Sequence, residues 1–194
     1  MPEQWPQLWV FAGPNGAGKS TLVATRLRER LPIVNPDVIA VRIGQDHPEF
    51  PAVIEAGKIA VRERARLLAA RESFAIETTL SGNSEIRLMR EAGGAGYRVN
   101  LVFVGVRSAH VSEVRVAHRV RMGLHNVPLD DIQRRYHRSM ENLPIAMRLA
   151  ERSVVVDNTG RGFRLLMIRR GGVTRTYGRK LSTWLLEAVP PDLR

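Results

Sequence analysis

A glycine-rich stretch near the start of the sequence, "FAGPNGAGKSTL" at 11–22, carries the residue types that bind phosphate. The part from Gly13 to Ser20 fits the pattern G-x-x-x-x-G-K-[ST], in which glycines let successive backbone N–H groups turn toward one anion. In this pattern the lysine reaches the β- and γ-phosphates, and the hydroxyl ligates Mg²⁺. Lys19 and Ser20 therefore predict binding of ATP with Mg²⁺. The structural alternative is an ordinary glycine-rich turn, which leaves Lys19 unexplained.

The loop predicts a set of nucleotide contacts but does not specify the reaction. The residues expected to contact the nucleotide are Gly13, Pro14, Asn15, Gly16, Ala17, Gly18, Lys19, Ser20 and Thr21. The sequence has no N-K-x-D stretch for base recognition, which counts against a GTPase. The apolar stretch "NLVFVGV" ends in Arg107 and Ser108 instead of the acidic pair of a motor ATPase. A small kinase is the remaining class, and the short chain favours it.

Two carboxylates follow predicted strands, at the edge where an open parallel sheet binds its ligand. Asp37 comes after "VNP", and Glu77 lies in "IETT". A carboxylate can orient an acceptor hydroxyl and take its proton during phosphoryl transfer, so Asp37 is our candidate catalytic base. Glu77 and Thr78 are candidate substrate-binding residues. The alternatives are that Asp37 caps a helix, that Glu77 is a solvated charge and that Thr78 only suits a strand.

The segment 108–140 gathers arginines and histidines on two predicted helices. Arg115 and Arg119 are four residues apart and therefore share a helix face. Arginines above a phosphate-binding loop can neutralise the charge on a transferring phosphoryl group, so we predict a helical lid with these two as catalytic residues. Arg134 and Arg135 are weaker candidates for the same lid. The alternative is a solvated basic face. The histidines are too scattered to predict a metal site.

Alternating strands and helices must position these residues. Apolar runs predict strands at 7–12, 33–37, 73–79, 97–106 and 152–158. Strands that are apolar on both faces and separated by helices indicate an α/β fold with a parallel sheet flanked by helices, as in P-loop NTPases and kinases. The tail predicts a small C-terminal hairpin turning at Gly171–Gly172 and a short helix at 181–188. We predict one domain, 1–194.

Helices are expected at 20–31, 52–71, 84–92, 108–121 and 129–150. Ser84 is expected to cap the third of them, and Gly93 and Gly94 to stop it. Pro144 is expected to break or kink the last. In the helix at 52–71, apolar residues recur every seven: Val53, Ala60 and Leu67, and Ile54, Val61 and Leu68. The arginines on its remaining surface are expected to be solvated: Arg62, Arg64, Arg66 and Arg71.

Composition limits the class of protein. The 194 residues include no cysteine, which excludes disulfides, thiolate nucleophiles and cysteine zinc sites. No apolar run is long enough to span a bilayer, and the start has no signal-peptide pattern, so we expect a cytoplasmic protein that does not contact a membrane. The formal net charge of +11 attracts nucleic acid non-specifically. The alternative explanation for this charge is a high-GC genome that favours arginine codons, with the arginines on solvated faces.

The motifs together resemble the zeta toxin family, in particular its short single-domain members. The segments that carry the resemblance are "AGPNGAGKST", "NPD", "ETTLSG", "RVxxRV", "GLHNVP", "IQRRYHRSMENL" and "VVDN", over residues 8–158. The resemblance implies an ATP- and Mg²⁺-dependent kinase that phosphorylates the 3′-hydroxyl of the amino sugar in UDP-N-acetylglucosamine. It implies a toxin–antitoxin context, with any neutralising antitoxin on a separate chain, acidic where it meets the lid.

The resemblance also implies roles for individual residues. Lys19 and Ser20 would hold phosphates and magnesium, Asp37 would be the base, and Glu77 would touch the sugar nucleotide. Arg115 or Arg119 would belong to the pair that clamps the γ-phosphate. The chain departs from the family at 123–125, where Gly-Leu-His replaces Gly-Gly-His, and it lacks the larger body of the well-studied toxins.

Other readings remain open from the sequence. A kinase for another small metabolite uses the same residues. A P-loop nucleic-acid binder or polynucleotide kinase-like enzyme uses the +11 charge, but only 6% of the residues are aromatic and the tryptophans lie far from the arginines in sequence, which counts against base stacking. A catalytically inactive nucleotide-binding regulator does not need the three residues Lys19, Asp37 and Glu77 together.

Overall fold

The computed structural model describes residues 5–26, 31–46, 52–122, 127–178 and 180–194. The strands in these residues are β1 (Gln7–Ala12), β2 (Ile33–Val34), β3 (Phe74–Thr78), β4 (Arg98–Gly105), β5 (Arg152–Asp157), β6 (Arg164–Arg170) and β7 (Val173–Thr176). The helices are α1 (Lys19–Arg26), α2 (Pro36–Asp46), α3 (Ala52–Ala69), α4 (Asn83–Gly94), α5 (Ala109–Arg121), α6 (Leu129–Leu149) and α7 (Thr183–Ala188), followed by a 3₁₀ turn at Pro191–Leu193.

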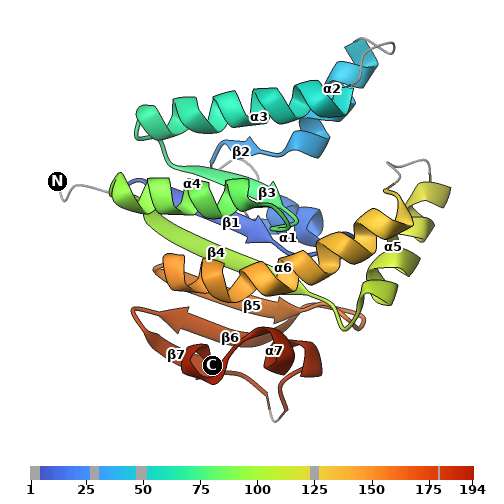
Figure 1. The fold of residues 1–194 in the computed structure, drawn as a ribbon, viewed down its shortest axis with the longest axis vertical. Coiled ribbons are helices and arrows are strands. Elements are labelled where there is room, and N and C mark those ends of the chain that lie inside the picture. Colours follow the sequence, from blue (N-terminus) through green and yellow to red (C-terminus); the bar gives the residue numbers. More distant parts are fainter. Residues whose placement is uncertain (1–4, 27–30, 47–51, 123–126, 179) are drawn as a thin grey trace.

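The described strands form one sheet in the order β2-β3-β1-β4-β5-β6-β7 (Figure 1). Strands β2, β3, β1, β4 and β5 pair in parallel, and β6 and β7 are antiparallel. The predicted α/β fold with a parallel sheet and flanking helices is confirmed. Because these five parallel strands run in the same direction, their carboxyl ends meet at one edge of the sheet. The glycine-rich loop begins at this edge, and both candidate carboxylates lie there.

The predicted C-terminal hairpin is confirmed as β6 and β7. Gly171 and Gly172 have φ of +55° and +86°, which is the backbone that a two-residue primed turn requires. The hairpin does not stand apart from the rest of the fold, because β6 also pairs with β5 and extends the main sheet. Among the described residues, no helix combines the length and apolar character needed to cross a bilayer.

Helices cover both faces of the sheet, and the buried side chains of each strand alternate between the two faces. On one face, Val10 and Phe103 belong to a buried cluster that includes side chains of α3, α4, α6 and α7. On the other face, Phe11 and Val102 pack with Val23 of α1. Successive side chains of a strand point to opposite faces of the sheet. α1, which directly follows the glycine-rich loop, is thereby fixed against β1.

Helix α2 was not predicted, and the start of α4 differs from the prediction. The strand expected at 33–37 ends at Val34, and α2 begins at Pro36, because proline fits the first helical position. Helix α4 begins after Gly82 instead of being capped by Ser84, and it continues through Gly93 and Gly94.

Helix α4 ends at Gly94, two residues later than the predicted end at Ala92. Gly96 has φ of +78°, and the N–H of Tyr97 donates to the carbonyl of Ala92 at 2.9 Å, as in a glycine-terminated helix end.

Pro144 was predicted to break or kink its helix, and the break is wrong. α6 is helical from Leu129 to Leu149. An internal proline costs a helix about 3 kcal/mol. Leu143, Ala146 and Met147 around it are fully buried in the core, so tertiary packing outweighs the local penalty.

Helix α3 also departs from its predicted pattern. Of the residues in the seven-residue repeat, Ala60 and Leu67 are buried, whereas Val53, Ile54 and Val61 are exposed. The helix covers only the end of the sheet beside β2, so a narrower stripe of it reaches the core (Figure 1).

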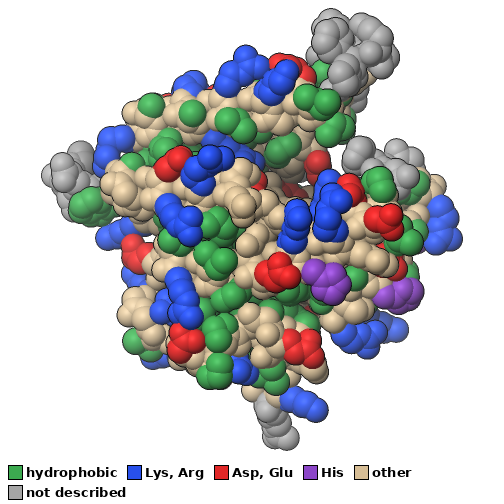
Figure 2. Space-filling model, in the orientation of Figure 1, with side chains coloured by type: hydrophobic (Ala, Val, Ile, Leu, Met, Phe, Trp, Pro, Cys, Tyr) green, Lys and Arg blue, Asp and Glu red, His purple; other side chains and the backbone are tan. Residues whose placement is uncertain are grey.

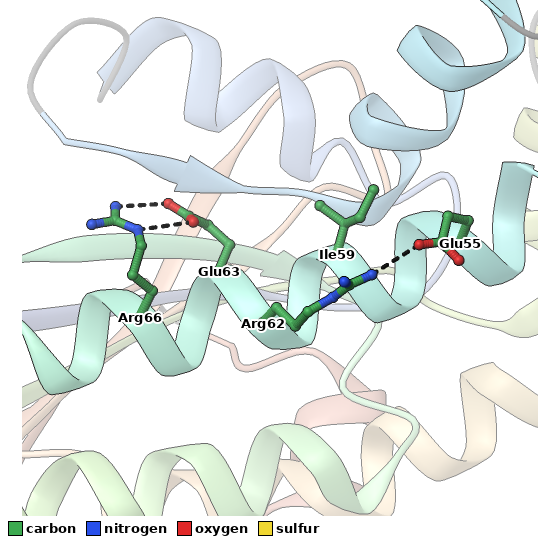
Figure 3. Close-up of a pocket in the computed structure, with 5 residues that line it drawn as sticks. All are labelled: Glu55, Ile59, Arg62, Glu63 and Arg66. Atoms are coloured by element: carbon green, nitrogen blue, oxygen red, sulfur yellow. Dashed lines mark hydrogen bonds and ion pairs between the residues drawn. The ribbon is translucent and has the colours of Figure 1, made fainter.

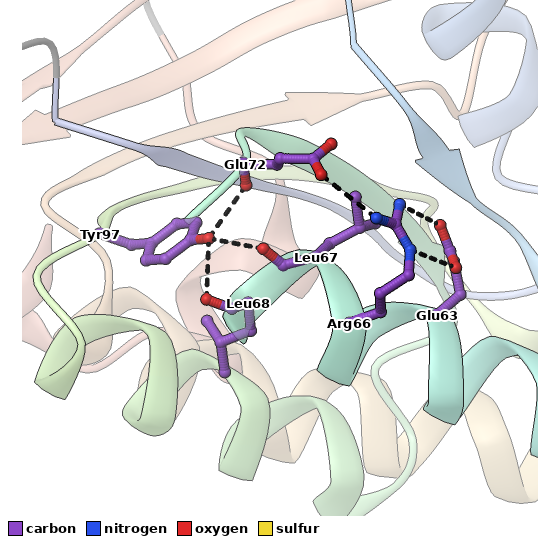
Figure 4. Close-up of polar contacts among 6 residues, drawn as sticks. All are labelled: Glu63, Arg66, Leu67, Leu68, Glu72 and Tyr97. Atoms are coloured by element: carbon purple, nitrogen blue, oxygen red, sulfur yellow. Dashed lines mark hydrogen bonds and ion pairs between the residues drawn. The ribbon is translucent and has the colours of Figure 1, made fainter. Parts of the chain in front are cut away.

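One of the arginines predicted to be solvated on α3 is buried. Arg64 is 7% exposed and forms an ion pair with Glu85 of α4 at 3.5 Å. Arg66, in contrast, pairs on the surface with Glu63 and Glu72 (Figure 4). The prediction was wrong for Arg64 because its partner lies on another helix and no local pattern reveals it.

The end of α3 is fastened to the start of β4. The hydroxyl of Tyr97 lies 3.0 Å from the carbonyl oxygens of Leu67 and Glu72 (Figure 4). The Tyr97 ring packs edge-on against Phe74 of β3. The hydroxyl thus satisfies carbonyls that the helix end leaves open.

Candidate active site

The glycine-rich loop links β1 to α1 and has the backbone that its pattern predicts. The φ angles are +139° at Gly13, +67° at Gly16 and +95° at Gly18, values that favour glycine. A Cβ at Gly13 would lie 2.1 Å from the carbonyl oxygen of Val104 in β4, so only glycine fits there. The conformation needed to turn backbone N–H groups toward a phosphate is present, and contact with nucleotide stays a prediction.

The remaining loop residues complete the turn. The carbonyl of Pro14 accepts a bond from the N–H of Ala17 at 3.3 Å. Asn15 is half-buried, and its Oδ1 is buried with no hydrogen-bond partner among the described residues. Thr21 is exposed in the first turn of α1, beside Ser20, which is exposed as well. The predicted contact residues therefore line one loop and one helix start.

Lys19 is held inside the loop. Its side chain is 8% exposed, and its Nζ donates to the carbonyl of Pro14 at 2.9 Å. Burial lowers the pKa of Lys19 to about 8, while the nearby charges of Glu77 and Asp37 act to raise the pKa and that of Arg119 to lower it further. The structure thus brings together four of the charged residues that the sequence singled out.

Ser20 and Glu77 meet at the edge of the sheet, although 57 positions separate them in sequence. The Ser20 hydroxyl donates to Glu77 Oε1 at 2.6 Å. The other oxygen, Oε2, accepts a bond from Asn35 Nδ2 at 2.9 Å. Because β2, β3 and β1 are neighbours, three side chains meet here: Asn35 after β2, Glu77 in β3, and Ser20 at the start of α1, which follows β1.

Asp37 does not cap the helix that it lies in. Its backbone N–H donates to Asn35 Oδ1 at 2.9 Å, so Asn35 takes the capping contact at the start of α2. The Asp37 side chain is exposed and close enough to Lys19 to act on its pKa. The structural alternative for Asp37 is therefore wrong, and its role as a base stays a prediction.

Thr78 lies at the end of β3 and stabilises the loop that follows. Its Oγ1 accepts a bond from the N–H of Leu80 at 3.0 Å. Leu80 is fully buried with φ of +57°, and Asn142 of α6 donates to its carbonyl at 2.9 Å. Such a conformation is costly for leucine and persists only where its surroundings fix it. The loop beside the candidate substrate residues is thus tied to α6.

The two predicted arginines of α5 face the glycine-rich loop. The guanidinium of Arg115 donates to the carbonyl of Gly16 at 3.4 Å and to that of Thr159 at 3.2 Å. Arg119 lies one turn further along the helix, and its charge acts on Lys19. In this structure Arg115 binds backbone carbonyls, and Arg119 is the one whose charge acts on Lys19.

The other predicted lid arginines are engaged elsewhere. Arg134 and Arg135 pair with Asp131, at 2.6 and 3.4 Å, on their own helix α6. Gln133 donates to Glu113 of α5 at 2.9 Å, which joins the two helices of the 108–140 segment. The residues at 123–125, where the sequence departs from the family it resembles, lie outside the described residues.

Sequence reasoning missed three polar residues around the site. Asn35 joins Glu77 to α2, as described above. Asn158, after β5, donates to the carbonyl of Ala17 at 2.8 Å. Asp157 accepts bonds from Thr159, Ser182 and Arg164. The late "VVDN" segment was the available signal for Asp157 and Asn158, whereas nothing in the local sequence marks Asn35 as a partner of Glu77.

Other features of the surface do not belong to this site. A shallow hollow on α3 is lined by Glu55, Ile59, Arg62, Glu63 and Arg66, and two ion pairs cross it (Figure 3). It contains none of the predicted site residues. Within the described parts of the chain, no three or more His, Asp and Glu side chains gather into a metal-binding group.

Comparisons with known proteins agree with the fold and the loop. The model of the AAA domain family AAA_33 matches residues 8–143. An uncharacterized protein from Haemophilus influenzae is 32% identical over 137 residues, which are 67% of this chain and 97% of that protein.

Among solved structures, the complex AvrRxo1-ORF1:AvrRxo1-ORF2 with sulphate ions is similar, with a TM-score of 0.75 and 16% identity over 96% of this chain and 64% of that one. The same complex with ATP is similar with a TM-score of 0.73 and 18% identity, over 90% of this chain and 61% of that one. This chain therefore spans somewhat less than two thirds of that protein. The PezAT toxin-antitoxin system of Streptococcus pneumoniae is also similar, with a TM-score of 0.61 and 15% identity over 84% of this chain and 70% of that one. At these identities the structures establish a shared fold. The chain belongs to the AAA domain family, and its fold is a mostly parallel sheet flanked by helices that it shares with these structures.

Proposed function

We propose that this protein is an ATP- and Mg²⁺-dependent phosphotransferase that transfers the γ-phosphate to a hydroxyl of a small metabolite. The observation that carries the proposal is the contact of Ser20 with Glu77 beside the buried Lys19. In P-loop enzymes that cleave or transfer a phosphoryl group, Mg²⁺ is held by the loop hydroxyl together with a carboxylate from a neighbouring strand. Ser20 and Glu77 supply this pair of groups.

Each residue has a distinct task in this proposal. The backbone of the glycine-rich loop and Lys19 bind the phosphates. Asp37, exposed at the start of α2, accepts the proton of the acceptor hydroxyl. Arg119 balances the charge of the transferring group, and Arg115 holds α5 against the loop through the carbonyl of Gly16. Thr78 and Glu77 orient the acceptor.

The oxygen ligands beside the loop fit Mg²⁺. The Ser20 hydroxyl and the Glu77 carboxylate are hard donors 2.6 Å apart, and such oxygens are the preferred ligands of this ion. The ion would be held by Ser20, with Glu77 oriented by Asn35 at its side. When bound, it neutralises phosphate charge.

For the acceptor we propose a nucleotide sugar, with UDP-N-acetylglucosamine as the first candidate. This choice rests on the resemblance of "ETTLSG" and "RVxxRV" to zeta toxins, together with a fold shared with a toxin-antitoxin protein. The same resemblance suggests a separate antitoxin chain as a partner. We further propose that 1–194 acts as one domain and that 108–140 is its lid.

Product formation tests the proposal directly. The protein is incubated with ATP, Mg²⁺ and UDP-N-acetylglucosamine, and then with a metabolite extract, and products are identified by mass. We expect a product heavier by one phosphoryl group, formed at least about 100-fold more slowly by the Asp37→Asn variant. Normal ATP binding with no phosphorylated product in either mixture would refute the kinase.

A polynucleotide kinase-like protein is the second candidate, and the net charge of +11 is the observation that favours it. On the face drawn in Figure 2, however, acidic side chains lie among the basic ones. On α3, Arg62, Arg64 and Arg66 are each paired with a glutamate. Phosphorylation of a DNA or RNA 5′ end would support this candidate, whereas a steep loss of affinity with salt and no product would leave only charge-driven binding.

A further inference from the structure

Helices cover one face of the central sheet more completely than the other. The buried cluster on the first face includes side chains of α3, α4, α6 and α7. On the second face, Val23 of α1 and Val102 of β4 share a small buried cluster, and Val102 is 8% exposed. The register partner of Val102 on β5 is Val154, whose own partner on β6 is Ile168, and both are only half-buried. The second face thus becomes more open from β4 toward β7.

Arginines occupy the open part of this second face. Residues two apart on a strand share a face, so Arg152 lies on the face of Val154, and Arg170 on that of Ile168. Arg152 and Arg170 are register partners on β5 and β6, and both are exposed. Arg175 of β7 is the register partner of Ile168 and is exposed as well. Three neighbouring strands therefore contribute to one basic surface, the sheet-face arginines: Arg152, Arg170 and Arg175.

The charge of the sheet-face arginines is not balanced locally. Among the described residues, no carboxylate pairs with any of the three. Arg152 and Arg170 stand directly opposite each other, and like charges in that arrangement are destabilising. On α3, in contrast, Arg62 and Arg66 each pair with a glutamate. An anion that bridges β5 and β6 would remove the repulsion, so this surface fits a negatively charged partner.

One row of the sheet brings an aromatic side chain into line with these arginines. Trp9 of β1, Asn100 of β4, Arg152 and Arg170 are successive register partners. At about 4.8 Å between neighbouring strands, the row spans about 14 Å. Trp9 is half-buried on the same face as Val102. The distance in sequence between the tryptophans and the arginines counts against base stacking, but for Trp9 the sheet removes that distance.

We propose that the sheet-face arginines bind the phosphates of a single-stranded nucleic acid, with the half-buried side chains of Trp9, Val154 and Ile168 beneath its bases. Arginine presents a planar fork of donors that matches phosphate oxygens. In several single-strand binders, an open sheet face with aromatic side chains holds the bases. A second copy of this chain does not fit the surface, because arginines would then meet arginines.

This surface is separate from the candidate active site. Arg152 is the first residue of β5, whereas the glycine-rich loop follows the carboxyl end of β1, which is parallel to β4 and β5. The surface and the loop therefore lie toward opposite ends of the parallel strands. The inference goes beyond the proposed kinase activity, because it assigns nucleic-acid binding to a defined surface away from the phosphate-binding loop.

Salt-dependent binding of a labelled oligothymidylate to the full chain tests the surface. Fluorescence anisotropy is measured with a strand of about 16 nucleotides, long enough for one site. Three phosphate contacts predict that the logarithm of the binding constant falls with the logarithm of the salt concentration with a slope of about −2, at about −0.7 for each contact. Arg152→Ser combined with Arg170→Ser should reduce the steepness by about 1.4 and weaken binding about 25-fold at about 0.1 M salt.

A matched pair of variants controls for net charge. Arg62→Ser combined with Arg66→Ser removes the same charge from exposed positions on α3, and should change the affinity by less than about twofold. The Arg152→Ser, Arg170→Ser variant loses a like-charge contact, so its urea midpoint should not fall and its ATP affinity should be unchanged. Equal weakening of oligothymidylate binding by the two pairs of substitutions would reduce the effect to net charge and overturn the surface.

Two competitors separate the surface from other sites and partners. Saturating ATP with Mg²⁺ should leave the oligothymidylate bound, and its displacement would place the strand at the glycine-rich loop and overturn the inference. Poly-L-glutamate of equal charge should bind more weakly than the oligothymidylate. Tighter binding of poly-L-glutamate would assign the surface to an acidic protein instead. No product formation enters these measurements, so failure of the proposed kinase activity and failure of this inference are distinguished.

Discussion

Replacing Lys19 by methionine is expected to stabilise the nucleotide-free protein while abolishing ATP binding. The Lys19 side chain is 8% exposed, and burial lowers its pKa from 10.5 to about 8. A buried ammonium group that loses hydration is unfavourable even with carboxylates nearby. Methionine keeps a similar stem and carries no charge, so it removes this cost.

The size of the effect follows from the pKa shift. A change from 10.5 to about 8 corresponds to about 3 kcal/mol at pH 7, at about 1.4 kcal/mol for each pKa unit. The sign follows from proton binding: between pH 8 and 10.5 the unfolded state binds more protons than the folded state, so the unaltered protein gains stability as pH rises. By pH 9.5, about 2 kcal/mol of the difference from Lys19→Met should have disappeared.

Urea unfolding of both proteins at pH 7 and 9.5 measures this difference. Comparing the variant with the unaltered protein removes the effect of other titrating groups. Lys58→Met is the matched control, because Lys58 is exposed and pairs only on the surface with Glu55; its stability difference should be the same at both pH values. A difference for Lys19→Met that does not change with pH would refute the argument from burial.

Three further substitutions test other parts of the site. Asp37→Asn should keep ATP affinity and lower turnover at least about 100-fold, the usual size of a general-base contribution, in a coupled assay; full activity would remove Asp37 as the base. Gly13→Ala should cost more than about 3 kcal/mol or prevent folding, because its Cβ would lie 2.1 Å from a carbonyl oxygen of β4, and a urea midpoint near that of the unaltered protein would contradict this. Burial acts to raise the pKa of Asp157, but hydrogen bonds from Ser182, Thr159 and Arg164 outweigh it and lower the pKa. The resulting stabilisation is present above the ordinary pKa and lost as pH falls through the folded-state value, so Asp157→Asn should destabilise by about 2 kcal/mol at pH 7 and by less at pH 3.

Local sequence was sufficient to predict the parts of the site that depend on backbone conformation. The loop has positive φ at Gly13, Gly16 and Gly18, and because glycine favours positive φ, the glycines before Lys19 predict this backbone from the sequence alone. The placement of Glu77 near the loop was also predictable, because strand ends of a parallel sheet share an edge. The fold class followed from the same alternation of apolar strands and helices.

Contacts between distant residues could not be predicted in this way. The Asn158 side chain donates to the carbonyl of Ala17, 141 positions away in the sequence. The buried Arg64 pairs with Glu85, which lies on another helix. Pro144 signals a helix end, yet the buried residues around it hold the helix together. In each case the deciding energy comes from tertiary packing, which local propensity does not record.

The charges around Lys19 explain why the loop tolerates a buried cation in the free protein. Lys19 and Arg119 carry positive charge, and Glu77 and Asp37 carry negative charge, so the four groups together are balanced. Lys19 meanwhile donates to the carbonyl of Pro14, which a phosphate oxygen would replace as acceptor. A polyphosphate would add the negative charge that makes protonated Lys19 favourable. The desolvation energy that lowers the pKa of Lys19 in the free protein would therefore be recovered when a polyphosphate binds. A binding residue that lowers the stability of the free protein in this way is common at functional sites.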